Sequence, residues 1–110
     1  MEERKFDSAR MKPIEFFVVA KNLETGYEAW YRTAYLQGFS KKSLAAAFAT
    51  GEPLEGYFWR KVPALYRIVT HAGQEFKGAR WSREKNGFIV DGLDVVFSRK
   101  GCREIWEYSE

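Results

Sequence analysis

The chain has very few of the residues that usually carry metal or redox chemistry. Its 110 residues contain one cysteine, Cys102, and one histidine, His71. A single cysteine cannot form a disulfide within the chain, and it favours a reducing, intracellular environment. A single histidine is too few for the zinc and nuclease sites that use several such ligands. The carboxylates are scattered among basic residues without an acid/base pair, so we expect a protein that is not an enzyme and has no metal ion or cofactor.

Long hydrophobic runs and a large excess of one charge are also missing. No stretch approaches the ~20 apolar residues of a membrane span, and the charged start lacks the apolar core of a signal peptide. We therefore expect a cytoplasmic protein with no membrane contact. Lysine and arginine total 18 against 15 aspartate and glutamate residues, which gives a net charge of +3. A dedicated nucleic-acid binder often has a stronger bias, so any basic surface must come from the arrangement of the charges.

The sequence does contain one order of segments twice. Residues 16–62 and 65–110 each have an apolar stretch, a turn, an aromatic stretch, a Gly-Phe pair, a short helical pattern and an aromatic tail. The pairs related by this repeat, 49 positions apart, are Gly38/Gly87, Leu44/Leu93 and Phe48/Phe97. A unit of this size is near the lower limit for an independent core, roughly 40–60 residues. The repeat therefore predicts a small duplicated module that packs on its copy or forms a homodimer.

The first half has the clearer signals of secondary structure. Apolar runs at 14–19 and 27–30 flank a turn that contains Gly26, which predicts a β-hairpin. Helical spacing over 31–37, ended by a glycine, predicts a short first helix. Ser40 fits the N-cap of a second helix that runs to Thr50 and ends at Gly51, with Leu44, Ala47 and Phe48 as its inward stripe. The aromatic segment at 57–59 is then expected to form a closing strand.

The second half is expected to follow the same plan. We predict a hairpin around Gly73, a polar first helix over 79–85, and a second helix from an N-cap at Asp91 to near Gly101. The predicted fold is α+β, with two tandem ββ-αα-β modules, each a hairpin, a helix-turn-helix and a closing strand. Their expected bounds are 14–62 and 64–110, after a flexible lead-in at 1–13.

Two segments of the first module resemble a known family. They are Gly38-Phe39-Ser40-Lys41-Lys42-Ser43-Leu44 and Gly51-Glu52-Pro53-Leu54-Glu55-Gly56-Tyr57-Phe58-Trp59-Arg60. Their order, spacing and composition are similar to the modular DNA-binding repeats of intron-encoded nucleases. Those repeats contain a Gly-apolar-Ser turn, a helix that starts Ser-basic-Ser, and a Gly-aromatic-aromatic-Trp-basic ending. They accompany nuclease domains in phages and mobile elements, but no nuclease motif is present in this sequence.

The resemblance implies that the second helix of the first module contacts double-stranded DNA. Carried over by position, the contact residues at the DNA are Ser40, Lys41, Lys42, Ser43 and Ala46, and Arg32 and Arg60 contact phosphates. We expect Lys61 to hold the phosphate backbone together with these two arginines. Two lysines at a helix start also conflict with the helix dipole, and a bound phosphate would relieve that conflict.

The second module lacks the Ser-basic-Ser signature. Asp91 and Asp94 would repel phosphate there, so this half is expected to face protein. The leading prediction is a small non-enzymatic DNA-binding regulator of phage or mobile-element origin. The alternative is a protein-interaction module that binds and modulates a host protein and has lost DNA binding. The aromatic tails fit either core packing or stacking on bases.

Overall fold

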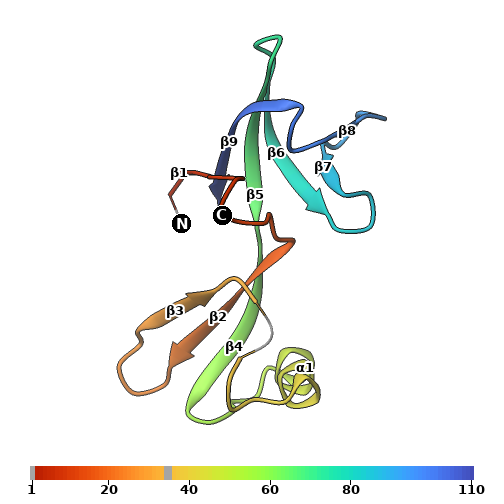
Figure 1. Cartoon of the computed structure of the whole chain (residues 1–110). Helices are drawn as coiled ribbons and strands as arrows, with labels where there is room; N and C mark the ends of the chain where they lie inside the picture. Colours follow the sequence, from red (N-terminus) through yellow and green to blue (C-terminus); the bar gives the residue numbers. More distant parts are fainter. Residues whose placement is uncertain (1, 34–35) are drawn as a thin grey trace. The chain divides into compact units, whose positions relative to one another are not determined.

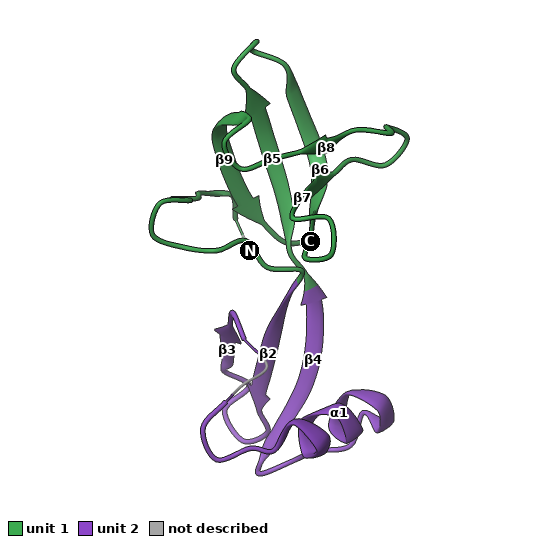
Figure 2. Cartoon of the chain, turned by 45° about the vertical axis from the view of Figure 1, so that its right-hand side comes forward, with its two compact units in different colours: residues 1–15, 63–110 green, residues 16–62 purple. Residues whose placement is uncertain are grey.

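β-Strands are the main regular secondary structure of this protein. The computed structural model describes residues 2–33 and 36–110, with 44% of the chain in strands and 9% in helix, so the class is mostly β. The chain divides into two compact units (Figure 2). Unit 1 comprises residues 1–15 and 63–110, and unit 2 comprises residues 16–62. Figure 1 shows one sheet in each unit and a helix, α1, in unit 2.

Unit 2 contains a three-stranded sheet in the order β3-β2-β4. Its strands are β2 (Phe16–Asn22), β3 (Glu28–Tyr31) and β4 (Tyr57–Pro63). The turn between β2 and β3 is held by the Asn22 side chain, which accepts hydrogen bonds from the Glu24 and Thr25 amides at 2.9 and 3.0 Å. Gly26 closes this turn with a φ of 73°, a conformation that glycine adopts without steric cost. The predicted hairpin and closing strand of the first half are confirmed.

Helix α1 (Lys41–Thr50) has the predicted limits. Ser40 is its N-cap, and the Ser40 Oγ accepts a hydrogen bond from the Ser43 amide at 3.0 Å. At the other end Gly51 adopts a φ of 71° and donates its amide to the Ala47 carbonyl. These two caps satisfy backbone groups that the helix itself leaves unpaired. Local sequence chemistry therefore sets both ends of this helix.

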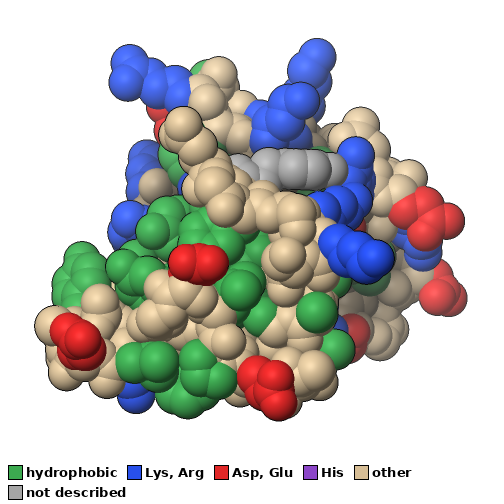
Figure 3. All heavy atoms as spheres, turned by 90° about the horizontal axis from the view of Figure 1, so that it is seen from below, with side chains coloured by type: hydrophobic (Ala, Val, Ile, Leu, Met, Phe, Trp, Pro, Cys, Tyr) green, Lys and Arg blue, Asp and Glu red, His purple; other side chains and the backbone are tan. Residues whose placement is uncertain are grey.

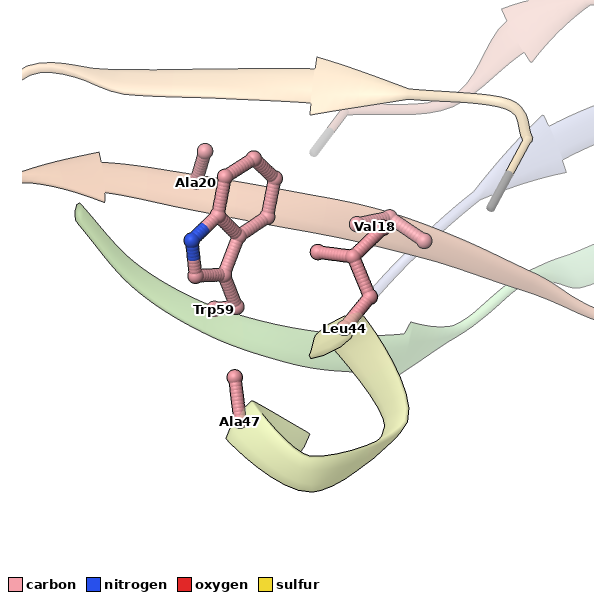
Figure 4. Close-up of a cluster of buried hydrophobic side chains, with 5 residues drawn as sticks. All are labelled: Val18, Ala20, Leu44, Ala47 and Trp59. Carbon is pink, nitrogen blue, oxygen red and sulfur yellow. The ribbon is translucent and has the colours of Figure 1, made fainter. Parts of the chain in front are cut away.

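The helix packs on one face of the unit 2 sheet. Leu44 and Ala47 from α1 meet Val18 and Ala20 from β2 and Trp59 from β4, all buried (Figure 4). The Trp59 indole N–H donates to the Leu54 carbonyl at 3.0 Å, so the ring is buried without an unpaired donor. This small cluster is the core that stabilises unit 2.

Unit 1 contains a six-stranded sheet in the order β1-β9-β5-β6-β7-β8. Its strands are β1 (Arg4–Lys5), β5 (Leu65–Thr70), β6 (Glu75–Ser82), β7 (Gly87–Ile89), β8 (Val96–Phe97) and β9 (Cys102–Tyr108). All its neighbouring strands pair antiparallel. The expected hairpin around Gly73 is present as β5 and β6.

Tyr66 is the centre of the unit 1 core. Its buried ring lies 5.8 Å from the ring of Phe6 and 5.0 Å from the ring of Phe88. Its hydroxyl donates to the buried Glu107 carboxylate at 2.7 Å and accepts from the Ile14 amide at 3.0 Å. Because Ile14 precedes unit 2 in the chain and Tyr66 follows it, the bond between them joins the two parts of unit 1.

The predicted fold of two tandem ββ-αα-β modules is wrong. In residues 2–33 and 36–110 the structure has one helix, α1, and the second half has none. The expected helix over 79–85 is the end of β6 and a turn, and the segment expected to be helical from Asp91 contains β8. Val95 and Val96 are β-branched, which lowers helix propensity, and Gly92 has a φ of 86° that a helix does not accept.

A β-bulge in β6 explains why its second half, residues 79–82, was predicted to be helical. Tyr66 pairs with Ala79 but Ile68 pairs with Phe76, so β6 has one extra residue between these pairs. Gly78 lies there with a φ of 71°, which is a common conformation for glycine in a bulge. The extra residue changes the phase of the side chains along β6. The period-two pattern that marks a strand is therefore interrupted in the sequence.

Residues 49 positions apart in the two halves do not occupy equivalent places in the structure. Leu44 is buried in a helix, whereas Leu93 is 40% exposed outside any strand or helix. Phe48 lies in α1, but Phe97 lies in β8. The expected first helix over 31–37 is also absent where it can be assessed, because Tyr31 ends β3. Its members Ala34 and Tyr35 lie outside the described residues.

The unit 2 core gives a stability prediction. Leu44→Ala should lower the free energy of unfolding by about 2–5 kcal/mol, because it removes a side chain that is only 1% exposed. Urea denaturation followed by tryptophan fluorescence measures this change. The control, Ala45→Gln on the exposed side of α1, should stay within about 0.5 kcal/mol. Equal effects of the two substitutions would contradict the packing described above.

Candidate nucleic-acid interface

The start of α1 carries five of the predicted DNA-contact residues at the surface. Ser40, Lys41, Lys42, Ser43 and Ala46 are all exposed. The Ser40 hydroxyl donates to the Ser43 hydroxyl at 2.7 Å while it also caps the helix, so the two serines form one polar edge. The first turn contains no acidic residue that would repel an anion.

The outward side of α1 is unusually flat. Its exposed positions beyond the lysines are Ser43, Ala45, Ala46, Ala49 and Thr50. These methyl groups and two hydroxyls leave the helix backbone accessible to a close neighbour. The same positions lack the long side chains that would otherwise keep a DNA groove at a distance. This geometry permits the helix to approach a wide groove closely.

Lys61 lies on the same side of the sheet as α1. Its Nζ is 4.9 Å from the centre of the Phe16 ring and 5.2 Å from that of Phe48. These distances are within the range of cation–π attraction, and Phe48 belongs to α1. We call Ser40, Lys41, Lys42, Ser43, Ala46 and Lys61 the helix surface.

Arg60 lies on the opposite face of the same sheet. Its neighbour Trp59 points to α1, and successive side chains of a strand point to opposite faces. The Arg60 guanidinium lies 5.7 Å from the centre of the Trp30 ring, and its Nη2 donates to Glu28 Oε2 at 2.8 Å. Val18 and Ala20 point to the core on the helix side, so Val19 between them points to the opposite face. Trp30 pairs with Val19 and therefore lies on that opposite face with Arg60.

Arg32 joins this second group of residues. Its guanidinium carbon lies 5.9 Å from the centre of the Phe17 ring, and Phe17 makes an edge contact with Trp30 at 5.5 Å. Lys21 pairs with Glu28 across the strands, so its side chain lies on the same face as Glu28. Phe58 is next to Trp59 on β4, so its side chain points away from α1, to this face as well. We call Lys21, Glu28, Trp30, Arg32, Phe58 and Arg60 the outer sheet face.

The structure thus separates the predicted site residues into two groups. Lys61 accompanies the helix residues, whereas Arg32 and Arg60 lie across the sheet from them. Sequence reasoning also missed Trp30 and Phe58 as surface residues beside arginines. The period-two alternation within each strand was the available signal, because it separates Phe58 and Arg60 from Trp59 and Lys61.

Charges of both signs occur over the surface. Figure 3 shows Lys and Arg side chains in several groups, a hydrophobic area beside them, and separate Asp and Glu side chains on the same view. This distribution agrees with the small net charge of +3. Binding of an anionic partner therefore depends on local clusters and not on the overall charge.

Within the described part of the chain, no group of three His, Cys, Asp or Glu side chains is arranged to hold a metal ion. Cys102 is buried, and burial raises the pKa of its thiol, which disfavours the reactive thiolate. Among the same residues, no helix is long and apolar enough to cross a membrane.

Comparison with known proteins adds no family. No protein-family model matches the chain, and searches of curated proteins and of solved structures give no match either. The similarity to the repeats of intron-encoded nucleases therefore stays a prediction from the sequence.

The Arg60–Glu28 pair gives a prediction about pH. The hydrogen bond from Arg60 lowers the pKa of Glu28 below its usual range. The contribution of this pair to stability is therefore complete above the ordinary glutamate pKa of about 4.3, and it is lost as the pH falls through the lower pKa of the folded state. Arg60→Gln should return the pKa of Glu28 toward the ordinary value in an NMR titration of the side-chain carboxyl. Arg103→Gln, which removes an exposed arginine from unit 1, should leave Glu28 unchanged. An unaltered Glu28 titration in Arg60→Gln would contradict the assignment.

Proposed function

We propose that this chain is a non-enzymatic DNA-binding protein that contacts duplex DNA through the helix surface of unit 2. The observation that carries the proposal is the exposed first turn of α1, which combines Lys41 and Lys42 with no acidic residue. Both charges are placed against the direction of the helix dipole, which favours anions at this end. A DNA phosphate at this position would interact favourably with the two ammonium groups and with the positive end of the helix dipole.

The shape of α1 supports insertion into a major groove. The groove of B-DNA is about 12 Å wide and admits a helix. Ala46 and Ala49 face outward with small side chains, so bases could be approached closely along this side. Lys61, which lies beside Phe48 of α1, adds a third positive charge on the same side of the sheet. The sequence resemblance, which includes the same lysines, implies DNA contact by the same helix.

Charge reversal on α1 tests this proposal without weakening the fold. Lys41→Glu combined with Lys42→Glu should abolish duplex binding, measured by fluorescence anisotropy with a mixed-sequence duplex. Acidic residues in the first turn of a helix are favourable, so the thermal stability should be equal or higher. The matched control is Lys77→Glu combined with Lys85→Glu, which makes the same change of charge at two exposed positions of unit 1. If the control variant lost binding equally, the loss would result from the change in net charge and not from the position of the lysines, which would contradict the proposal.

The salt dependence provides a second measurement. Three phosphate contacts, from Lys41, Lys42 and Lys61, predict a slope of about −2.7 for the logarithm of the binding constant against the logarithm of the salt concentration. Affinity should therefore fall about 40-fold between about 50 and about 200 mM salt. No binding to any duplex at the lower salt concentration would overturn the proposal.

The edge of the unit 1 sheet favours a second candidate function, the binding of a host protein. β8 is the last strand of the sheet, and Leu93, Val95 and Val96 around it are 40%, 52% and 43% exposed. An exposed apolar edge strand is a template for pairing with a strand of another chain. Asp91 and Asp94 beside it disfavour a nucleic acid at this edge.

Pull-down from a host lysate tests this second candidate. A partner should be captured equally well with and without nuclease treatment, and Leu93→Lys combined with Val95→Lys should abolish its capture. Lys41→Glu combined with Lys42→Glu should leave that capture unchanged, because it alters the other unit. Capture that disappears after nuclease treatment would contradict the candidate and would instead indicate a shared nucleic acid.

A further inference from the structure

We infer that the outer sheet face of unit 2 is a separate binding site for single-stranded nucleic acid. This site does not depend on the helix surface, because its side chains point to the other side of the same sheet. The inference rests on three features of this face: an exposed aromatic ring, arginines supported by aromatic rings, and a charge balance that favours an anion.

The first feature is Phe58. Phe58 is 45% exposed although it is a large apolar residue, the second of β4, a strand that packs a core on its other side. The exposed ring lies two positions from Arg60 on β4, which places both on one face. Trp30, from the other outer strand of the sheet, is half-buried on the same face. An unpaired base can stack on such a ring, because every base has a π-face.

The second feature is the support of the arginines by rings. Arg60 lies over Trp30 at 5.7 Å, and Arg32 lies over Phe17 at 5.9 Å. Contact with a ring restricts a long side chain before any ligand arrives, so less conformational entropy is lost on binding. The planar guanidinium also matches the geometry of a phosphate group. Arginines held in this way next to an exposed ring provide both phosphate contact and stacking.

The third feature is the balance of charge on this face. Lys21, Arg32 and Arg60 oppose one acidic side chain, Glu28. The Arg60 side chain is 51% exposed and that of Glu28 is 34% exposed, so a phosphate can reach Arg60 from solvent. Glu28 already accepts a hydrogen bond from Arg60 at 2.8 Å and therefore competes with the phosphate. Glu28 should then limit the affinity of the site.

A single strand fits these features better than a duplex does. In a duplex the faces of the bases are stacked on one another and cannot reach Phe58, whereas a single strand exposes them. The outer sheet face also has no helix that could enter a major groove, since α1 packs on the other face of the sheet. Unpaired bases stacked near Phe58, with flanking phosphates at Arg32 and Arg60, use every feature of the face.

The test is the binding of a labelled oligothymidine of about 12 nucleotides, a length within the usual range for one such site. Phe58→Ala should weaken binding by about 5- to 150-fold, the range for loss of one stacked base. Phe16→Ala is the matched control, because it removes a ring of similar exposure, 43%, from the helix side; it should change the affinity less than twofold. Glu28→Gln should tighten binding several-fold because it removes the competing carboxylate. Lys41→Glu combined with Lys42→Glu should leave oligothymidine binding unchanged.

Several results would overturn the inference. They are absence of oligothymidine binding at low salt, equal effects of Phe58→Ala and Phe16→Ala, and weaker binding by Glu28→Gln. Equal affinity for a poly-glutamate peptide would also overturn it, because an acidic peptide offers charge without bases to stack. Should Phe58→Ala fail to fold, as judged by circular dichroism, Lys21→Glu replaces it. That exposed substitution on the same face should weaken oligothymidine binding, and unchanged binding would again reject the site.

Discussion

The packing of Trp59 against α1 determines how unit 2 presents its surface. The ring is buried with Leu44 and Ala47, and its N–H is satisfied by the Leu54 carbonyl. Because side chains alternate along a strand, this one contact fixes the phase of all of β4. A shift of one residue would bury Arg60 against the helix, where its charge would lose water without a partner, at a high cost in free energy. The two candidate surfaces of unit 2 are therefore consequences of its core.

Elements defined by local chemistry could be predicted from the sequence. Both ends of α1 followed from Ser40 and Gly51, since capping depends on residues next to the helix. The hairpins around Gly26 and Gly73 were likewise marked by turn residues between apolar runs. The lysines of the candidate site were found for the same reason, because they adjoin a recognisable cap. These features need only a few neighbouring residues.

The rest of the fold depends on pairings between distant segments. The bulge at Gly78 interrupts the pattern of β6, and nothing local shows that Phe76 pairs with Ile68. The apparent repeat matched glycine and apolar positions that have different structural roles in the two segments. Leu44 is buried, for example, whereas Leu93 is exposed. The grouping of Arg60 with Trp30 and Glu28 also required the strand register. The motif alone assigned Arg60 to the phosphate backbone of the DNA that the helix contacts.

The course of the chain through unit 1 makes unit 2 an insertion. The polypeptide leaves unit 1 after Glu15 and returns at Pro63, and the Ala64 amide donates to the Glu15 carbonyl at 3.1 Å. The departure and return points are thus joined by a backbone hydrogen bond, as in an ordinary tight loop of a host domain. An excursion anchored in this way can be gained, lost or exchanged with little disturbance of the host sheet. The 47 intervening residues therefore begin and end at neighbouring points of unit 1.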